Sequence, residues 1–221
     1  MIRVKICCMA SVEEARTAVA AGASALGLVG RMPSGPGPIS DELIAEIAAT
    51  VPPGVATFLL TSETEPEAVV EHVRRSGANT VQLVDRVAGQ TYAALRRALP
   101  LVKLVQVVHV ADQEALGEAI QAAHHVDALL LDSGSFCGPV KELGGTGRVH
   151  DWELSRRIVE SVPRPVYLAG GLKPENVVEA IEKVRPFGVD LCTGVRTEGR
   201  LDQAKLQAFM QAVRSTNRVF D

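Results

Sequence analysis

One repeat constrains the fold of this chain more than any other feature of its sequence. A short apolar run rich in Val and Leu is followed by a longer segment of helical periodicity rich in Ala, Glu and Arg, and the pair recurs roughly every 25 to 30 residues. Eight such pairs fill the chain. This alternation predicts a parallel sheet, because a helical crossover usually joins two parallel strands.

The expected elements cover the chain from end to end. The apolar runs predict strands at 3–8, 25–29, 55–60, 80–84, 101–108, 126–132, 166–170 and 189–193. Helical periodicity predicts helices at about 11–21, 40–50, 65–76, 88–98, 112–122, 151–161, 174–185 and 202–216. Short polar side chains accept hydrogen bonds from the free amides of a first helical turn, so the expected N-caps are Ser11, Ser40, Asp112 and Asp151.

Eight parallel strands can form an open sheet or close into a barrel. Regular units without an inserted second domain favour closure, which also removes both exposed edges of the sheet. With 47% hydrophobic residues and only 4% aromatic ones, the core must be built from Ala, Val, Leu and Ile. We therefore expect an α/β fold, a single (β/α)8 TIM barrel that forms one domain over residues 1–221.

Charge and hydropathy limit the partners of the chain. The 23 basic and 26 acidic residues are spread along the sequence and give a net charge of −3, which favours neither nucleic acid nor an anionic membrane as a partner. No apolar run is long enough to span a membrane, and Arg3 and Lys5 would interrupt the apolar region of a signal peptide. We expect a cytoplasmic protein whose partner is a small molecule. No sequence feature indicates the oligomeric state.

Four cysteines, Cys7, Cys8, Cys137 and Cys192, show neither CxxC spacing nor a nearby histidine cluster. This pattern argues against a metal site and against a disulfide framework, so we expect free thiols. Neighbouring residues of a strand face opposite sides, and only one of Cys7 and Cys8 can face the end of the barrel. We expect Cys7 to point inward on the same side as Lys5, Cys8 to pack against the helices, and the other two cysteines to have packing or loop roles.

Cys7 ends the first expected strand and Asp132 ends the sixth. Barrel closure would bring this thiol and this carboxyl together at the C-terminal ends of the strands, where barrel enzymes have their active sites. A thiolate can remove a proton from carbon while a carboxylic acid protonates a departing oxygen. Each residue also has a structural interpretation, since cysteine is often buried and an aspartate at a strand end often caps a loop.

Glycine-containing turns follow the last two expected strands. Gly170 and Gly171 end the seventh strand, and Thr193 and Gly194 follow the eighth. Backbone amides in such turns, beside a short helix N-terminus, form a phosphate site common in these barrels. One such turn alone would more often be a simple chain reversal, whereas two at consecutive strand ends predict an anion site.

A further glycine-rich segment, Gly144-Gly145-Thr146-Gly147, lies in the long loop of residues 133–150. Glycines would allow this loop to close over a substrate, and Gly144 and Gly145 are candidate binding residues. The segment lacks the trailing Lys-Ser/Thr of a nucleotide P-loop. The alternative is a flexible surface loop without function, which is less favoured because the loop starts directly after Asp132.

The chain also carries six motifs in a characteristic order: Lys5-Ile6-Cys7, Val81-Gln82-Leu83, Leu130-Leu131-Asp132-Ser133, Gly144 to Gly147 followed by Asp151-Trp152, Leu168 to Leu172 followed by Pro174-Glu175-Asn176, and Arg185 to Asp190. Taken together they resemble the phosphoribosylanthranilate isomerase family. The resemblance runs along the whole chain, and the ordered set is far more specific than any single motif.

The resemblance implies an Amadori rearrangement in tryptophan biosynthesis. N-(5-phosphoribosyl)anthranilate would become 1-(2-carboxyphenylamino)-1-deoxyribulose 5-phosphate, without a cofactor. Cys7 would be the base and Asp132 the acid. The backbone near Gly171 and Gly194 would hold the phosphate of this small sugar substrate.

The chain departs from the family pattern at the end of the barrel that would hold the substrate. Gly37 replaces an arginine that pairs with the anthranilate carboxylate in the family, and Cys8 replaces a glycine. Arg31, Arg86 and Arg196 are the candidates to replace the missing cation. Two alternatives stay open: a paralogue that isomerises another phosphorylated sugar adduct, and a non-catalytic barrel that binds a sugar phosphate or a protein partner.

Overall fold

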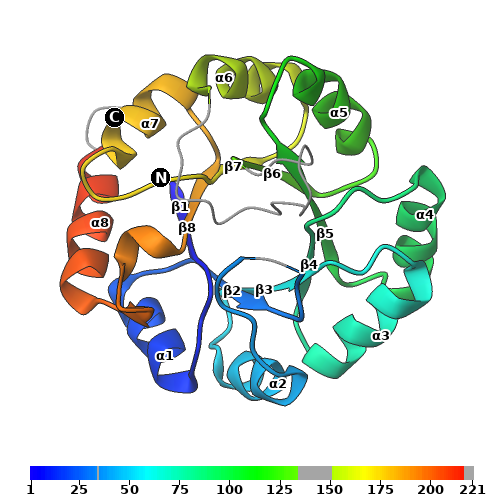
Figure 1. Cartoon of the computed structure of the whole chain (residues 1–221), viewed down its shortest axis with the longest axis horizontal. Coiled ribbons are helices and arrows are strands. Elements are labelled where there is room, and N and C mark those ends of the chain that lie inside the picture. Colours follow the sequence, from blue (N-terminus) through cyan, green and yellow to red (C-terminus); the bar gives the residue numbers. More distant parts are fainter. Residues whose placement is uncertain (34, 134–150, 217–221) are drawn as a thin grey trace.

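The computed structural model describes residues 1–33, 35–133 and 151–216 of the chain. Eight parallel strands close into a barrel, and α1 to α8 form a ring around it (Figure 1). Each strand pairs with its successor, and β8 pairs with β1, so the predicted (β/α)8 TIM barrel is confirmed. Closure leaves the barrel strands in the described ranges without a free edge.

The elements follow the predicted runs to within a few residues. The strands are β1 Arg3–Ile6, β2 Ala25–Val29, β3 Ala56–Thr61, β4 Thr80–Leu83, β5 Lys103–His109, β6 Ala128–Asp132, β7 Val166–Leu168 and β8 Gly188–Leu191. The helices are α1 Val12–Ala21, α2 Asp41–Thr50, α3 Pro66–Ser76, α4 Gly89–Ala98, α5 Glu114–Ala123, α6 Trp152–Ser161, α7 Val177–Val184 and α8 Gln203–Thr216. Between β8 and α8 lie the 3-10 turn η1 Thr193–Val195 and the small hairpin of β9 Arg196–Thr197 and β10 Arg200–Leu201.

Three of the four predicted N-caps are confirmed. The side chains of Ser11, Ser40 and Asp151 accept hydrogen bonds from amides in the first turns of α1, α2 and α6. Asp112 is not the cap of α5, because the helix begins two residues later, at Glu114. The Asp112 carboxylate still accepts the Glu114 N–H at 2.8 Å, so it acts on the helix start from one position farther out.

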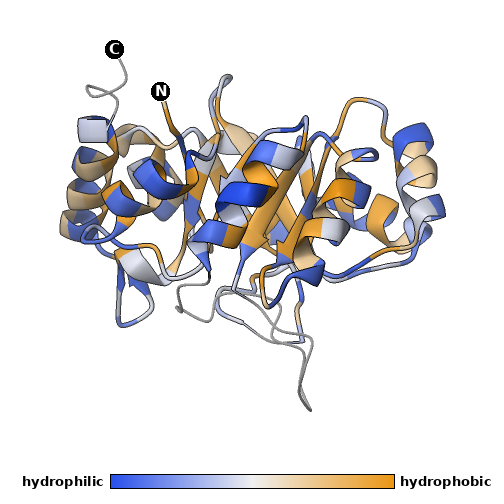
Figure 2. Cartoon of the chain, turned by 90° about the horizontal axis from the view of Figure 1, so that it is seen from above, coloured by the Kyte–Doolittle hydropathy of each residue, from blue (hydrophilic) through white to orange (hydrophobic). Residues whose placement is uncertain are grey.

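Two separate cores result from the alternation of side chains along the strands. On β5, Val105 and Val107 belong to the cluster inside the barrel, whereas Leu104 and Val108 belong to the larger cluster between the strands and the helices. Figure 2 shows the same division, with apolar residues on the strands and many polar residues on the outward faces of the helices. The helices therefore hold a rigid cylinder whose strand ends position the site.

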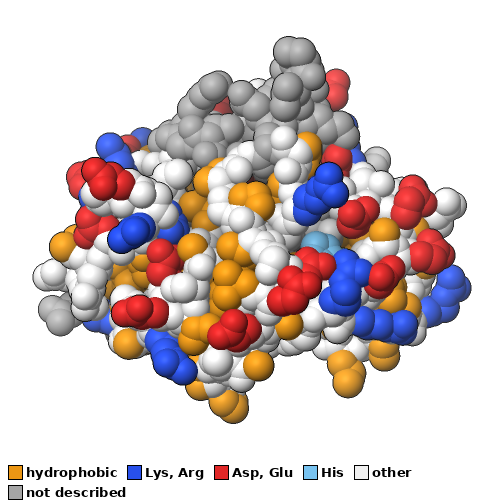
Figure 3. Space-filling view, turned by 60° about the horizontal axis from the view of Figure 1, so that its bottom comes forward, with side chains coloured by type: hydrophobic (Ala, Val, Ile, Leu, Met, Phe, Trp, Pro, Cys, Tyr) orange, Lys and Arg blue, Asp and Glu red, His pale blue; other side chains and the backbone are white. Residues whose placement is uncertain are grey.

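Acidic and basic side chains are intermingled on the molecular face seen in Figure 3. Glu71 and Arg75, for example, pair on one turn of α3. This mixture agrees with the small net charge of −3. Among the described helices, none has the length and apolar character needed to cross a membrane.

Candidate active site

A cavity lies at the C-terminal ends of the strands, inside the ring of helices. Its lining includes five residues that the sequence predicted for the site: Cys7, Asp132, Gly170, Gly171 and Thr193. The predicted thiol and carboxyl therefore border one shared space, and the glycine turns lie beside them. Among the described residues that line it, none is a lysine or an arginine.

Cys7 directly follows β1, and the neighbouring strand fixes its backbone. The Cys7 N–H donates to the Leu191 carbonyl of β8 at 2.8 Å. Only 6% of the residue is exposed, and its side chain belongs to the cluster inside the barrel. The predicted inward direction of Cys7 thus agrees with the structure.

Asp132 is the last residue of β6, and its side chain is partly buried. Its Oδ1 accepts the N–H of Ser133 at 2.7 Å, which orients the carboxyl group. Its carbonyl accepts the N–H of Val110 at 2.9 Å, so the end of β6 is tied to the chain that follows β5. His109 is the partner of Asp132 in the β5–β6 register, and its Nε2 lies 3.2 Å from the Val84 carbonyl oxygen.

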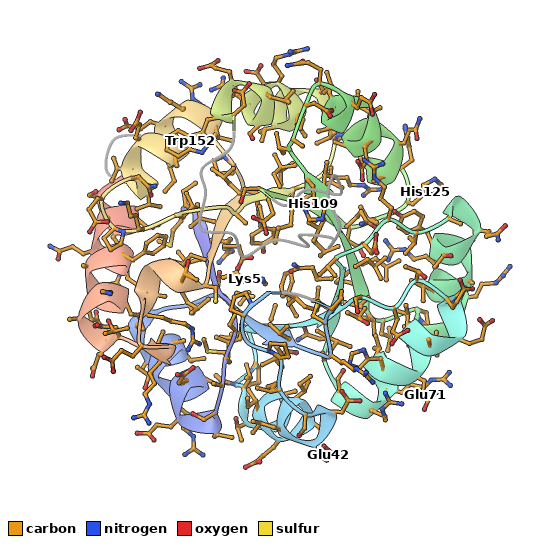
Figure 4. The ribbon with its side chains drawn as sticks, in the orientation of Figure 1. Lys5, Glu42, Glu71, His109, His125 and Trp152 are labelled. Atoms are coloured by element: carbon orange, nitrogen blue, oxygen red, sulfur yellow. The ribbon has the colours of Figure 1, made fainter. Side chains whose placement is uncertain are left out.

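A buried ion pair fixes one wall of the cavity. Lys5 Nζ lies 2.9 Å from Asp190 Oδ1, and the two side chains are 0% and 8% exposed. Burial opposes the lysine charge, but the Asp190 carboxylate outweighs this effect and raises the pKa of Lys5 above its ordinary value. Burial also raises the pKa of Asp190, and Lys5 limits that rise. Figure 4 shows Lys5 near the centre of the barrel, whereas Glu42 and Glu71 lie at its circumference.

Two turns bring backbone amides together beside the cavity. Gly170 and Gly171 follow β7 and have positive φ angles of 84° and 62°. Gly194 in η1 packs against the chain after β7, and a Cβ atom at this position would lie 2.1 Å from the Leu172 carbonyl oxygen. Glycine is therefore required at position 194 for the two turns to approach each other. Such paired turns offer backbone N–H groups to an anion.

The three arginines considered as partners for a substrate carboxylate have different surroundings. Arg86 pairs with Glu118 at 2.5 Å and lines a different cavity, between α4 and α5. Arg196 is mostly buried and pairs with Glu14 at 2.8 Å. Arg31 is exposed and lies in the loop after β2, part of which lines the active-site cavity. Arg86 therefore lies away from this cavity, and Arg196 forms an ion pair with Glu14.

The expected packing of Cys8 against the helices is wrong. Cys8 lines the cavity, as does Cys192. The strand ends at Ile6, and Cys8 has a φ of 64°, so the alternation of a strand no longer determines the direction of its side chain. The Cys8 thiol donates to the Pro36 carbonyl at 3.6 Å. The candidate residues Cys137, Gly144 and Gly145 lie outside the described residues.

Gly37, at the position of the family's arginine, packs on Cys8. Its φ is 87°, and a Cβ atom there would lie 2.5 Å from the Cys8 Cβ. A residue with a side chain would therefore both strain the backbone and collide with Cys8. The two departures from the family pattern, at positions 8 and 37, are physically coupled.

Gln82 and Asp190 line the cavity as well, although neither was singled out as a site residue. Gln82 is 3% exposed, and among the described residues its Oε1 has no hydrogen-bond partner. A buried acceptor without a partner beside a cavity is a candidate ligand contact. The motif Val81-Gln82-Leu83 contained the signal, since a polar residue at the centre of an apolar strand has few other reasons to be there.

Fold and site together define a (β/α)8-barrel enzyme with a thiol, a carboxyl and two glycine-containing turns around one cavity. A sequence model of the family described as N-(5'phosphoribosyl)anthranilate (PRA) isomerase matches residues 4–212. The chain belongs to this family, which confirms the resemblance inferred from the ordered motifs.

Individual relatives match along nearly the whole chain. The N-(5'-phosphoribosyl)anthranilate isomerase of Methanocella arvoryzae is 37% identical over 217 residues, which cover 98% of this chain and 100% of that protein. The enzyme of the same name from Halobacterium salinarum is 37% identical, with 98% of this chain and 97% of that protein covered. A crystal structure of phosphoribosyl anthranilate isomerase in complex with reduced 1-(o-carboxyphenylamino)-1-deoxyribulose 5-phosphate has a TM-score of 0.81 at 28% identity, covering 97% of this chain and 100% of that one.

Proposed function

We propose that this chain isomerises N-(5'-phosphoribosyl)anthranilate to 1-(2-carboxyphenylamino)-1-deoxyribulose 5-phosphate, an Amadori rearrangement of tryptophan biosynthesis. Membership of the isomerase family along the whole chain supports this function. The single structural observation that carries the proposal is that Cys7, directly after β1, and Asp132, the last residue of β6, line one cavity. The relative solved with a reduced form of this product has the same fold.

The first step requires an acid, and we assign this role to Asp132. Its carboxyl group protonates the ring oxygen of the ribose, the bond between that oxygen and C1 breaks, and the anomeric nitrogen forms a Schiff base with C1. The bond from the Ser133 N–H holds one carboxyl oxygen, so the group keeps a fixed orientation towards the cavity. Asp132 leaves this step as a carboxylate.

The second step requires a base, and we assign this role to Cys7. The Cys7 thiolate removes the proton from C2, and the electron pair moves into an enolamine while the Schiff-base nitrogen becomes neutral. Tautomerisation of the enolamine to the ketone completes the rearrangement. No atom is gained or lost, so proton transfers alone account for the reaction and we expect no cofactor.

The backbone turns provide the phosphate site in this proposal. The amides near Gly171 and Gly194 donate to the phosphate oxygens, and Thr193 borders the same part of the cavity. Backbone donors suit this role because the described cavity lining has no lysine or arginine. Gly144 and Gly145 remain predicted contacts of the substrate.

The test is turnover of freshly prepared phosphoribosylanthranilate, followed by the loss of its fluorescence. We expect turnover by the wild type and at least about a hundredfold lower kcat for Cys7→Ser and for Asp132→Asn, with unchanged unfolding curves. Binding of the substrate without turnover would instead support a non-catalytic barrel. Turnover of another phosphorylated aminoaldose in its place would support a paralogue.

A further inference from the structure

Two thiols that the proposed mechanism does not use meet at the end of the barrel. Cys8 follows β1 and Cys192 follows β8, and these strands are neighbours with Ile6 in register with Leu191. The chain continues this pairing beyond the strands, because the Cys7 N–H donates to the Leu191 carbonyl at 2.8 Å. Neighbouring strands lie about 4.7–4.9 Å apart, within the Cα separations of about 4.4–6.8 Å that a disulfide spans.

Side-chain directions bring the two sulfur atoms towards the same space. Both residues line the active-site cavity. The φ of 64° at Cys8 ends the strand alternation, and the two thiols lie close enough for each to shift the pKa of the other. In the described residues Cys7, Cys8 and Cys192 are free cysteines.

The surroundings make the two thiols chemically different. The neighbouring Cys8 thiol lowers the pKa of Cys192 in spite of its burial, and Arg196 lowers it further. The neighbouring Cys192 and Cys7 thiols, together with burial, raise the pKa of Cys8. Cys192 is partly exposed, whereas Cys8 is 5% exposed. Cys192 is thus the more acidic and the more exposed of the two thiols, and an oxidant reaches it before Cys8.

Several contacts hold Cys8 in this position. Arg196 donates to the Cys8 carbonyl and also to the Glu14 carboxylate, the latter at 2.8 Å. Glu14 in turn accepts the Leu201 N–H at 2.9 Å, so the hairpin after η1 and the start of α1 are tied together around Cys8. Gly37 packs on the other side of Cys8. The sulfur pair therefore lies on a fixed support rather than on a free loop end.

We propose that Cys8 and Cys192 form an oxidation site, in which a peroxide converts the thiol pair to a disulfide that slows turnover. The Cys192 thiolate attacks one peroxide oxygen, the O–O bond breaks and hydroxide leaves, which gives a sulfenic acid at Cys192. Cys8 sulfur then attacks Cys192 sulfur, and the hydroxyl group leaves as water with the Cys8 proton. In total two thiols lose two electrons and two protons, and hydrogen peroxide is reduced to two molecules of water.

The effect on turnover follows from the positions of the two cysteines. Cys192 immediately precedes Thr193 in the turn after β8, and Cys8 immediately follows Cys7. A disulfide between them would cross-link the two segments in the wall of the cavity, beside Cys7 and Thr193, and restrict their adjustment to a substrate. This effect on turnover rests on the proposed function, whereas formation of the disulfide does not.

The disulfide itself is tested without an activity assay. The full chain is treated with hydrogen peroxide, its remaining thiols are blocked with N-ethylmaleimide during denaturation, and tryptic peptides are analysed by mass spectrometry without reduction. We expect peptide 6–16 linked to peptide 184–196, in the wild type and in Cys7→Ser but not in Cys8→Gly or Cys192→Ser. Glycine suits the positive φ at position 8, so Cys8→Gly tests the thiol without added backbone strain. A link that needs Cys7, or oxidation of the thiols without any link, would overturn the proposal.

Turnover measured before and after treatment with peroxide tests whether the disulfide slows the enzyme. We expect the wild type to lose at least about tenfold in kcat/KM as the linked peptide accumulates and to regain it with dithiothreitol. If the peptides are linked and turnover is unchanged, the proposed effect of the disulfide on activity is wrong, whereas the proposed oxidation site is supported. If the chain turns over no aminoaldose before treatment, the proposed function fails, while the peptide analysis still decides the disulfide.

Discussion

Lys5 Nζ of β1 and Asp190 Oδ1 of β8 lie 2.9 Å apart inside the barrel, and Lys5 precedes Cys7 by two residues. Each charge is buried, and each is tolerated because the other is present. We expect Lys5→Met to lower the free energy of unfolding by about 3–5 kcal/mol, since it leaves the Asp190 carboxyl buried without its partner. Urea unfolding monitored by circular dichroism measures this change.

The control for the ion pair is the double variant Lys5→Met/Asp190→Leu. Removing both charges should restore much of the stability that the single variant loses, because an apolar pair of similar volume needs no solvation. A single variant as stable as the wild type would show that the ion pair does not stabilise the barrel.

Glu14 and Arg196 make part of the stability depend on pH. Burial works to raise the pKa of Glu14, but Arg196 and the amides of Leu201 and Ala10 lower it below its ordinary value of 4.5. Stability from this carboxylate is therefore fully present above about pH 4.5 and is lost as the pH falls through the lower pKa of the folded state. We expect the difference in unfolding free energy between wild type and Glu14→Gln to shrink below pH 4.5. A difference that stays constant down to acid unfolding would contradict this.

We expect the Gln82 side chain to lower the stability of the fold and to contribute to substrate binding. Replacing it by Met removes a buried acceptor that has no partner in the described chain, so we expect the free energy of unfolding to rise by about 1 kcal/mol. If the substrate bonds to this oxygen, KM should increase about tenfold, which corresponds to one hydrogen bond. Urea unfolding and steady-state kinetics on the same preparation measure both changes.

Gln106→Met is the matched control for Gln82. Gln106 is also buried on a strand, but it accepts the Tyr92 hydroxyl at 2.8 Å and donates to the Asp85 carbonyl at 2.9 Å. We expect this variant to lose about 1–3 kcal/mol of stability. The Gln82 interpretation fails if the two glutamines respond alike.

Of the three candidate arginines, we predict that Arg31 pairs with the substrate's carboxylate. Arg86 and Arg196 already pair with Glu118 and Glu14, whereas Arg31 lies in the loop that borders the cavity. We expect Arg31→Gln to raise KM for phosphoribosylanthranilate about tenfold or more, because a charge-assisted bond is lost. Arg86→Gln should leave KM unchanged. Equal effects of the two changes would rule out this role for Arg31.

The variant Gly194→Ala tests whether the turns after β7 and β8 bind phosphate. A Cβ atom at this position would lie 2.1 Å from the Leu172 carbonyl oxygen, so Gly194→Ala must separate the two turns. We expect its Kd for inorganic phosphate, measured by calorimetry, to rise about tenfold or more. Gly117→Ala is the control: nothing lies within 4 Å of a Cβ there, and alanine should stabilise α5 without changing phosphate binding. Phosphate binding that survives Gly194→Ala would place the anion elsewhere.

Patterns that are local in sequence predicted the architecture well. A parallel strand is covered on both faces, so the strand is mainly apolar and the helix that packs on it has one apolar face. This pattern arises within each pair of strand and helix. Ser11, Ser40 and Asp151 cap their helices as expected because a cap needs only the next three residues. The N-cap predicted at Asp112 is wrong by one residue, because Gln113 occupies this position. The exact start of α5 depends on the path of the chain after β5.

Sequence alone determined the barrel, the order of its strands and the approximate region where each strand ends, because period and order along the chain are enough to define them. Tertiary structure decided which side chains meet there. The pairing of Lys5 with Asp190, the engagement of Arg196 by Glu14, and the turn of Cys8 towards Cys192 and Gly37 join residues far apart in the chain. Such contacts depend on distances that arise only when the barrel closes and its loops pack, and no local pattern encodes those distances.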